Sequence, residues 1–392
     1  MAAAPVVRPA AAAERQAPGR LLPYISPETR YFEVPGRVPL ESGACLDEVV
    51  VAYRTWGSPR HADASAVLIC HALTGSADVD LWWPGIIGPG NAFDPGRDYI
   101  VCSNILGGCY GTTGPASMRP GSGERYRAAF PPVSVRDMVN VQRLLLEHLR
   151  IERLSVVAGP SLGGMQALEW AAMYPERVRS IVPIGVGGRH SAWCIAMSEA
   201  QRAAIYADAN WRGGAYDEAA PPEQGLAAAR MMAIVGYRSW QAFDRRFGRQ
   251  RRDGGELEVQ SYLRYQGEKI NRRFDAATYV RLTQAMNGHD LARGRGDYAA
   301  AVAAIRQPAL VVSIASDILY PPHEQQALAR QLPNARHEVL ESAEGHDGFL
   351  IETEKLGARI AAFRRGLRNL RPPRPELRPA LRASRRHPAS RP

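Results

Sequence analysis

The sequence lacks several features that would assign it to a specialised class of protein. Its longest apolar runs, such as residues 66–70, are too short to span a bilayer, so no membrane segment is expected. Residues 1–25 have no compact Leu, Ile and Val core, which argues against a secretory signal, although a transit peptide stays open because this end is poor in acids. The five cysteines include no C-x-x-C pair, which predicts neither disulfides nor a zinc site and favours a cytoplasmic protein.

The excess of positive charge is confined to one end of the chain. Residues 366–392 hold eight arginines and one glutamate, which is a net of +7 out of the total of +10. This basic tail is also rich in proline, so we expect it to be disordered, as we do for residues 1–25. The body of the chain is close to neutral, and no nucleic-acid partner is expected from its charge.

The length and the pattern of apolar segments predict one large α/β domain with an insertion. Over residues 26–190, short buried-strand runs alternate with helical stripes, which implies a mostly parallel central sheet covered on both faces. Residues 191–296 have a helical pattern, and the strand pattern resumes over residues 297–365. We interpret the helical insertion as a lid over the carboxyl edge of the sheet, where open α/β sheets bind ligands.

The strongest motif lies in residues 154–170. A run with β-branched residues leads into Gly-Pro-Ser-Leu-Gly at residues 159–163, and a helical segment follows without a break. A strand, a sharp turn and a helix around G-x-S-x-G form a nucleophile elbow, which holds the serine exposed above the sheet. We therefore predict that Ser161 is a nucleophile; the alternative is a structural glycine turn.

A serine nucleophile needs two further side chains, a base within hydrogen-bond reach and an acceptor that orients the base. Asp317 follows the predicted buried strand at residues 309–314, and His346 lies in the loop after the next predicted strand, residues 336–341. The order Ser161, Asp317, His346 is that of α/β-hydrolases, and each residue falls beyond the carboxyl end of a strand. The sequence thus predicts a catalytic triad on an α/β-hydrolase fold.

Two backbone N–H groups are candidates for an oxyanion hole. In this fold one donor comes from the loop after a buried strand, here residues 71–75, and the other is the residue after the nucleophile. We assign Leu73 and Leu162 as these donors. Cys109, in a Gly-rich loop, is a much weaker candidate nucleophile. No metal ligands are predicted, and three histidines are expected to be structural or at the surface: His289, His323 and His337.

Motifs outside the triad separate this chain from a plain hydrolase. They are His-Ala-Leu-Thr-Gly at residues 71–75, the Gly-rich residues 104–115, Gly-Gly-Met-Gln-Ala-Leu-Glu-Trp at 163–170, residues 261–267 and 273–276, Ser-Asp at 316–317, and Gly-His-Asp-Gly-Phe-Leu at 345–350. Together they resemble the homoserine O-acetyltransferase family from about residue 31 to about residue 363. The resemblance implies transfer of acetyl from acetyl-CoA to the hydroxyl of L-homoserine through an acyl-serine intermediate, in methionine biosynthesis.

The resemblance also implies where the amino-acid substrate is held. In the family a lid arginine and a tyrosine seven residues later contact this substrate, and Arg230 and Tyr237 match that pattern. Asp347, next to the base, would hold the substrate ammonium. A solvated helix arginine is the alternative for Arg230, and a loop cap is the alternative for Asp347. The family further implies acetyl-CoA as a substrate without any cofactor, and a homodimer through the lid helices.

Other activities stay open at this point. Pro160 stands where the family more often has Gly, and Leu162 where Met is usual. The fixed φ of Pro160 and the non-helical conformation that it imposes on Gly159 both suit a strand end, but the change leaves open a subgroup with another acyl donor or acceptor. Serine in place of homoserine, and succinyl-CoA in place of acetyl-CoA, are the alternatives within the family. A carboxylic-ester hydrolase is the alternative on the same fold, because function depends on the site rather than on the fold.

Overall fold

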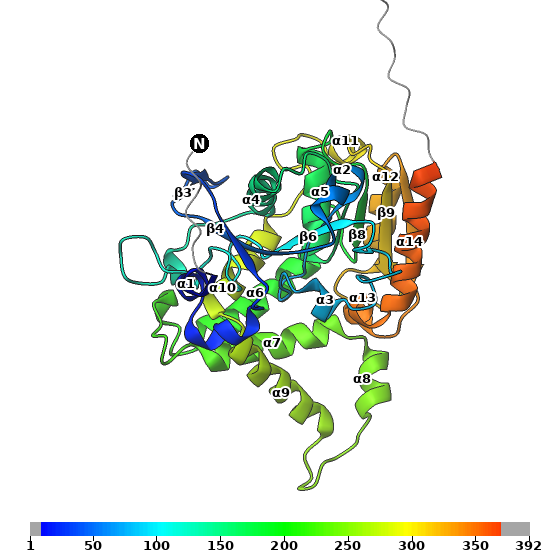
Figure 1. Ribbon diagram of the computed structural model, residues 1–392. Coiled ribbons are helices and arrows are strands. Elements are labelled where there is room, and N and C mark those ends of the chain that lie inside the picture. The colour runs from blue at the N-terminus through cyan, green and yellow to red at the C-terminus, as the bar shows by residue number, and fades with distance from the viewer. Residues whose placement is uncertain (1–8, 370–392) are drawn as a thin grey trace, which may run out of the picture.

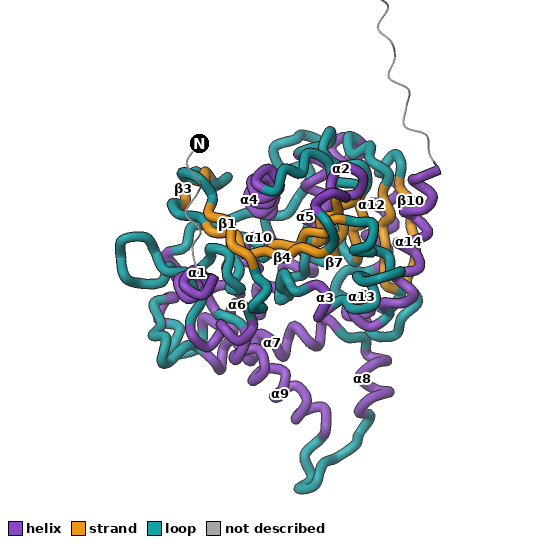
Figure 2. The backbone as a smooth tube through the Cα atoms, in the orientation of Figure 1, coloured by secondary structure: helices purple, strands orange, loops and turns teal. Residues whose placement is uncertain are grey.

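The computed structural model describes residues 9–369, which form a central eight-stranded sheet with helices on both of its faces (Figures 1 and 2). The strand order is β1-β4-β6-β5-β7-β8-β9-β10. The bounds are β1 Arg30–Glu33, β4 Val50–Trp56, β5 Ala66–Ile69, β6 Tyr99–Ser103, β7 Val156–Pro160, β8 Ile181–Ile184, β9 Ala309–Ile314 and β10 Ala335–Leu340. In this order, every neighbouring pair from β6 to β10 is parallel, whereas β4 is antiparallel to both of its neighbours, β1 and β6. This confirms the predicted mostly parallel sheet.

The buried strands are apolar on both faces, as a doubly covered parallel sheet requires. In β5, Ala66 and Leu68 belong to one core cluster, and Val67 and Ile69 belong to the other. Helices α4 (Val135–His148) and α5 (Leu162–Met173) complete the first cluster, while α14 (Thr353–Asn369) completes the second. The sheet is therefore a rigid frame, and its carboxyl edge carries the loops that matter for function.

The inserted segment between β8 and β9 is built from helices. They are α6 Ala192–Tyr206, α7 Glu223–Tyr237, α8 Trp240–Phe247, α9 Glu258–Arg273 and α10 Ala276–Asn287. Helix α7 packs between α6 and α9, and the α8–α9 arm projects away from the body (Figure 1). The remaining helices are α1 Pro9–Gln16, α2 Ala62–Ser65, α3 Val79–Trp82, α11 Tyr298–Ala303, α12 Pro322–Gln331 and α13 Gly348–Ile351, and a small second sheet pairs β2 Val38–Pro39 with β3 Cys45–Leu46.

The N-terminal segment differs from the expectation of disorder over residues 1–25. Residues 9–25 contain α1 and a 3₁₀ helix, Gly19–Tyr24, in which Leu21 is fully buried. Arg20 Nη1 donates hydrogen bonds to the carbonyl oxygens of Asn271, at 2.5 Å, and Phe274, at 3.1 Å, and so fastens the segment to the end of α9. The Ala- and Pro-rich composition does not predict this ordered structure, because the stabilising contacts come from residues about 250 positions away in the sequence. Residues 1–8 lie outside the described part.

The C-terminal end of the described chain is helical. Helix α14 runs to Asn369 and so includes the first four residues of the segment predicted to be a disordered basic tail. The rest of that segment, residues 370–392, lies outside the described residues. Between residues 9 and 369, no helix has the length and apolar character needed to cross a membrane.

Candidate active site

Ser161 sits at a sharp turn between β7 and α5, with φ 53° and ψ −124°, a conformation that L-residues rarely adopt. The turn brings the backbone of α5 against the strand next to it. A Cβ on Gly163 would lie 2.0 Å from the Cys70 carbonyl oxygen, and one on Gly159 would lie 2.5 Å from it. Pro160 fits here without distortion of the ladder, since it pairs with Ile184 at the end of β7. The local geometry is that of a nucleophile elbow.

The structure brings His346 and Asp317 together. His346 Nδ1 lies 2.6 Å from Asp317 Oδ2, and both side chains are buried. Asp317 Oδ1 accepts hydrogen bonds from the backbone N–H groups of Leu319 and Tyr320, both at 2.9 Å, which fixes the carboxylate. Burial favours neutral His346, but the charge and hydrogen bond of Asp317 outweigh it, so the pKa of His346 is raised. The imidazole is thus held in one orientation beside a negative charge.

Ser161 and His346 line the same cavity, but no hydrogen bond joins them. His346 Nε2 is buried and has no hydrogen-bond partner among the residues that the structure describes. Nucleophile–base hydrogen bonds are often long in unliganded enzymes and tighten in the complex with substrate. Space beside the His346–Asp317 pair comes from Gly185, where an added Cβ would lie 3.2 Å from His346 Cε1.

The loop with the first predicted oxyanion donor is shaped by His71. Its Nε2 accepts a hydrogen bond from Ile105 N at 3.3 Å, and Nδ1 donates to the Ala72 carbonyl oxygen at 2.8 Å. Burial lowers the pKa of His71 to about 4, so the ring is neutral and both nitrogens keep these contacts. Leu73 lines the cavity, and Leu162 is the first residue of α5 after the elbow. Neither of their N–H groups donates to a backbone carbonyl within residues 9–369.

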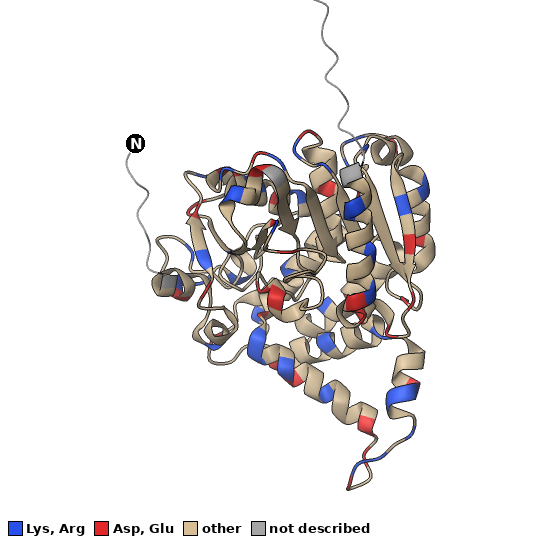
Figure 3. Cartoon of the chain, turned by 45° about the vertical axis from the view of Figure 1, so that its right-hand side comes forward, with Lys and Arg blue, Asp and Glu red and all other residues tan. Residues whose placement is uncertain are grey.

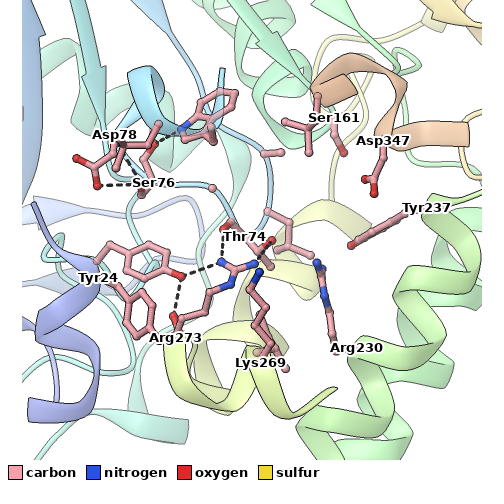
Figure 4. Close-up of a pocket in the computed structure, with 18 of the residues that line it drawn as sticks. Tyr24, Thr74, Ser76, Asp78, Ser161, Arg230, Tyr237, Lys269, Arg273 and Asp347 are labelled. Carbon is pink, nitrogen blue, oxygen red and sulfur yellow. Dashed lines mark hydrogen bonds between the residues drawn. The ribbon is translucent and has the colours of Figure 1, made fainter. Parts of the chain in front are cut away.

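The three residues predicted to hold the amino acid lie on the same cavity (Figure 4). Arg230 and Tyr237 project from α7, with the guanidinium carbon 5.5 Å from the centre of the Tyr237 ring. Arg230 Nη1 is buried and has no hydrogen-bond partner in the described chain. Asp347 lies 3.2 Å from Arg238 Nε, a contact that the sequence did not indicate. Burial raises the pKa of Asp347, although Arg238 and Arg230 act against the rise.

The cavity has a volume of about 770 Å³ and reaches well beyond these residues. Its further walls come from residues 23–27, from Leu81 and Trp82 on α3, and from α9, where Lys269 and Arg273 face inward. The motifs at residues 261–267 and 273–276 include Gln266 and Arg273, but they do not predict that this helix face, with Lys269 and Ile270 at the same spacing, lines the cavity. Cys109 does not line the cavity; it is fully buried, and burial raises the pKa of its thiol.

The described residues contain neither a cluster of metal ligands nor a disulfide. Within residues 9–369, no group of three or more His, Cys, Asp or Glu side chains is placed to hold a metal ion. The five cysteines all lie in this range and form no disulfide.

Comparisons with known proteins agree on the fold and the family. The family model for the alpha/beta hydrolase fold matches residues 65–353. A homoserine O-acetyltransferase of Chlorobaculum tepidum is 54% identical over 343 residues, which cover 88% of this chain and 96% of that protein. Another, from Trichormus variabilis, is 55% identical over 345 residues, again 88% of this chain and 96% of the relative. A crystal structure of an esterase is 28% identical, with a TM-score of 0.79 over 86% of this chain and 99% of that one. The chain therefore belongs to the homoserine O-acetyltransferase family, a family of acyltransferases with the α/β-hydrolase fold.

Proposed function

We propose that this protein transfers the acetyl group of acetyl-CoA to the hydroxyl of L-homoserine, in methionine biosynthesis. The observation that carries the proposal is the buried His346–Asp317 pair, 2.6 Å apart, on the cavity that Ser161 lines. The relatives at 54% and 55% identity, both named homoserine O-acetyltransferase, support the substrates.

In the first half-reaction, His346 takes the proton of Ser161 while the serine oxygen attacks the thioester carbonyl. Asp317 stabilises the imidazolium that forms, and the backbone N–H groups of Leu73 and Leu162 bind the oxyanion. A donor of this kind lowers the barrier by about 3 kcal/mol. CoA then leaves as a thiol with the proton from His346, and an acetyl-serine remains.

In the second half-reaction, homoserine binds with its carboxylate on Arg230 and Tyr237. Arg230 Nη1 is buried and has no hydrogen-bond partner among residues 9–369, which supports this role, because an unpaired buried donor is costly. The ammonium binds the carboxylate of Asp347, which also lies 3.2 Å from Arg238 Nε. His346 takes the proton of the substrate hydroxyl, whose oxygen attacks the acetyl group and restores Ser161. Because the side chains and backbone N–H groups named above supply the nucleophile, the base and the oxyanion donors in both half-reactions, the scheme needs no cofactor or metal.

An ester hydrolase is the second candidate, since a solved esterase shares this fold at 28% identity. The same acetyl-serine would then react with water. We propose that the helical segment 191–296 acts as a lid that keeps water from the acetyl-enzyme. The presence of Arg230 and Asp347 at the cavity favours the amino-acid acceptor, because a plain esterase has no need of two opposite charges there.

We also propose a homodimer through the lid. Large apolar side chains on its helices are exposed, among them Trp240 at 69%, Tyr265 at 56% and Val235 at 49%. Exposed apolar side chains that gather on one set of helices, here α7, α8 and α9, are typical of an interaction surface. The unpaired cysteines fit a reducing compartment, and we place the protein in the cytoplasm. Light scattering should give twice the mass of the 42.9 kDa chain, and a monomer would contradict the dimer.

The function is tested by a panel of two donors and two acceptors, with release of free thiol as the readout. We expect acetyl-CoA to be used in preference to succinyl-CoA, and homoserine in preference to serine. Homoserine is one methylene longer than serine, and a pocket discriminates between two such substrates by about 1–3 kcal/mol. Steady thiol release that does not depend on an amino acid would refute the transferase and favour the hydrolase.

A further inference from the structure

Residues 342–347, here called the base loop, carry His346 and are held on one side by the end of β9. Ser316 Oγ accepts a hydrogen bond from Gly345 N at 2.9 Å and donates one to the Ser342 carbonyl oxygen at 2.8 Å. Because Ser316 lies two residues after the last residue of β9, this side joins the base loop to the rigid frame of the sheet.

The other side of the base loop is held by the lid, at the joint between α7 and α8. The joint consists of Arg238 and Ser239, which follow Tyr237, the last residue of α7. Gly345 has a φ of 69°, and a Cβ there would lie 2.6 Å from Ser239 N and 2.7 Å from the Tyr237 carbonyl oxygen. Ser239 Oγ also donates a hydrogen bond to the Ala343 carbonyl oxygen. The backbones of the joint and the loop are therefore in direct contact one residue before the base.

Ion pairs reinforce the contact between the joint and the base loop. Arg238 Nη1 donates to Glu344 Oε2 at 2.6 Å, and Arg245 donates to the other oxygen of the same carboxylate from the basic last turn of α8, on the projecting arm (Figure 3). The side chains of Arg238 and Glu344 are only 20% and 19% exposed, so solvent screens this pair less than one on the open surface. Neither of the two lines the cavity around Ser161, so neither touches a substrate bound there.

We propose that the Arg238–Glu344 pair positions the catalytic base by holding the base loop against the lid. Asp317 fixes Nδ1 of His346, but Nε2 has no hydrogen-bond partner within residues 9–369, so its place depends on the backbone of the loop. A misplacement of about 1 Å at a reacting group costs about 10²-fold in rate. The inference rests on the triad of the proposed function and not on its acceptor, because acetylation comes first. The alternative is that the pair only stabilises the fold.

The test measures the rate constant of acetylation at saturating donor, by rapid quench and intact mass, without an amino acid. Two donors are used, acetyl-CoA and 4-nitrophenyl acetate, a small ester that reports on the triad without contacts to CoA. The final acetylated fraction gives the share of active protein, separately from the rate constant. The variants are Arg238→Ala, Glu344→Ala, the double variant and Glu344→Gln. The control is Arg249→Ala, which removes an exposed arginine from the same arm.

With both donors, we expect the rate constant to fall about 10²-fold in Arg238→Ala and by a similar factor in Glu344→Ala. The acetylated fraction and the half-saturating donor concentration should stay unchanged, because the binding walls of the cavity are intact. The double variant should not lose the product of the two factors, since both changes remove one contact. Glu344→Gln keeps an oxygen that accepts from Arg238 and should recover most of the rate, and Arg249→Ala should match the wild type.

Three results would overturn the positioning role. Variants with a lower melting temperature or acetylated fraction but the wild-type rate constant would assign the pair to stability alone. Losses that multiply in the double variant would show that the two residues do not act through one contact. If the alanine variants do not fold, a wild-type rate constant in Arg238→Lys, which keeps the charge but not the guanidinium geometry, together with one in Glu344→Gln, would overturn it as well. Failure of the proposed function is seen separately, in a wild-type protein that forms acetyl-enzyme but no acetylhomoserine.

Discussion

Replacement of Asp317 by Asn tests the proposed triad with almost no change in shape. Asp317 uses Oδ2 toward His346 Nδ1 at 2.6 Å, and Oδ1 toward the N–H groups of Leu319 and Tyr320 at 2.9 Å. In the variant, the amide oxygen must take the two backbone contacts, because an NH₂ group cannot accept them. The NH₂ group then faces His346 Nδ1 and can only donate to it.

This exchange leaves the imidazole with its proton on the wrong nitrogen. When Nδ1 accepts, the proton of neutral His346 is on Nε2, which is the atom that has to accept the proton of Ser161. The negative charge that stabilises the imidazolium is lost as well. A change of this kind lowers kcat by about 10⁴ in a Ser-His-Asp protease, which corresponds to about 5.4 kcal/mol in the barrier. Stability should change little, because both backbone hydrogen bonds of the side chain are retained.

The assay follows acetylation of the protein by acetyl-CoA without homoserine, by rapid quench and intact mass. We expect Asp317→Asn to form acetyl-enzyme about 10⁴-fold more slowly than the wild type. Asp47→Asn, which alters an exposed carboxylate paired with Arg37, should match the wild type. A folded Asp317→Asn protein that acetylates within tenfold of the wild-type rate would refute the reasoning, since His346 would then not depend on Asp317.

Three further predictions concern the base His346, the proposed substrate ligand Arg230, and a buried ion pair between Asp98 and Arg364. Burial lowers the pKa of His346, but Asp317 raises it more. The value of kcat/KM should therefore be full above this raised pKa and should be lost as pH falls through it, because the base must be unprotonated. An acid limb of the pH profile with its midpoint below the usual histidine pKa of about 6.5 would contradict this. Arg230→Ala should raise the KM for homoserine at least tenfold and leave the acetylation half-reaction unchanged, and unchanged KM values would make it a solvated helix arginine. Asp98→Ala leaves the buried guanidinium of Arg364, now 2.7 Å from Asp98, without its partner; urea unfolding should show a loss of about 3–5 kcal/mol, against less than about 1 kcal/mol for Asp47→Ala.

The parts of the fold and site that the sequence predicted are those with local signals. The strands are short apolar runs, and the elbow is a contiguous motif whose glycines are needed for the approach to Cys70. Asp317 and His346 could be placed near Ser161 because parallel strands end at one edge of a sheet. The chain order of the triad in this fold then selected them among the other acids and histidines.

The parts that it did not predict depend on contacts between distant segments. The order of residues 9–25 comes from hydrogen bonds of Arg20 to the end of α9 and from the burial of Leu21, and neither follows from local composition. The pairing of Asp347 with Arg238 is of the same kind, because one residue is in the lid and the other is beside the base. The residues around Lys269 have a helical spacing, but that spacing alone does not predict which part of the molecule, or which cavity, the helix face contacts.

The triad does not separate a transferase from an esterase, so the difference has to lie in the walls of the cavity. Those walls are made by segments outside the sheet: α7 with Arg230 and Tyr237, α9 with Lys269, and the 3₁₀ helix Gly19–Tyr24. The two charges nearest the triad are not equivalent. Arg230 Nη1 has no hydrogen-bond partner in the described chain, whereas Asp347 lies 3.2 Å from Arg238 Nε, although no hydrogen bond joins them and Arg238 Nη1 donates to Glu344 at 2.6 Å. In the proposed complex the substrate ammonium would therefore share Asp347 with a resident cation. Binding of the amino acid should therefore depend more on its carboxylate than on its ammonium. Removing the carboxylate of homoserine should cost more affinity than removing its amino group, and the reverse order would place the dominant contact at Asp347.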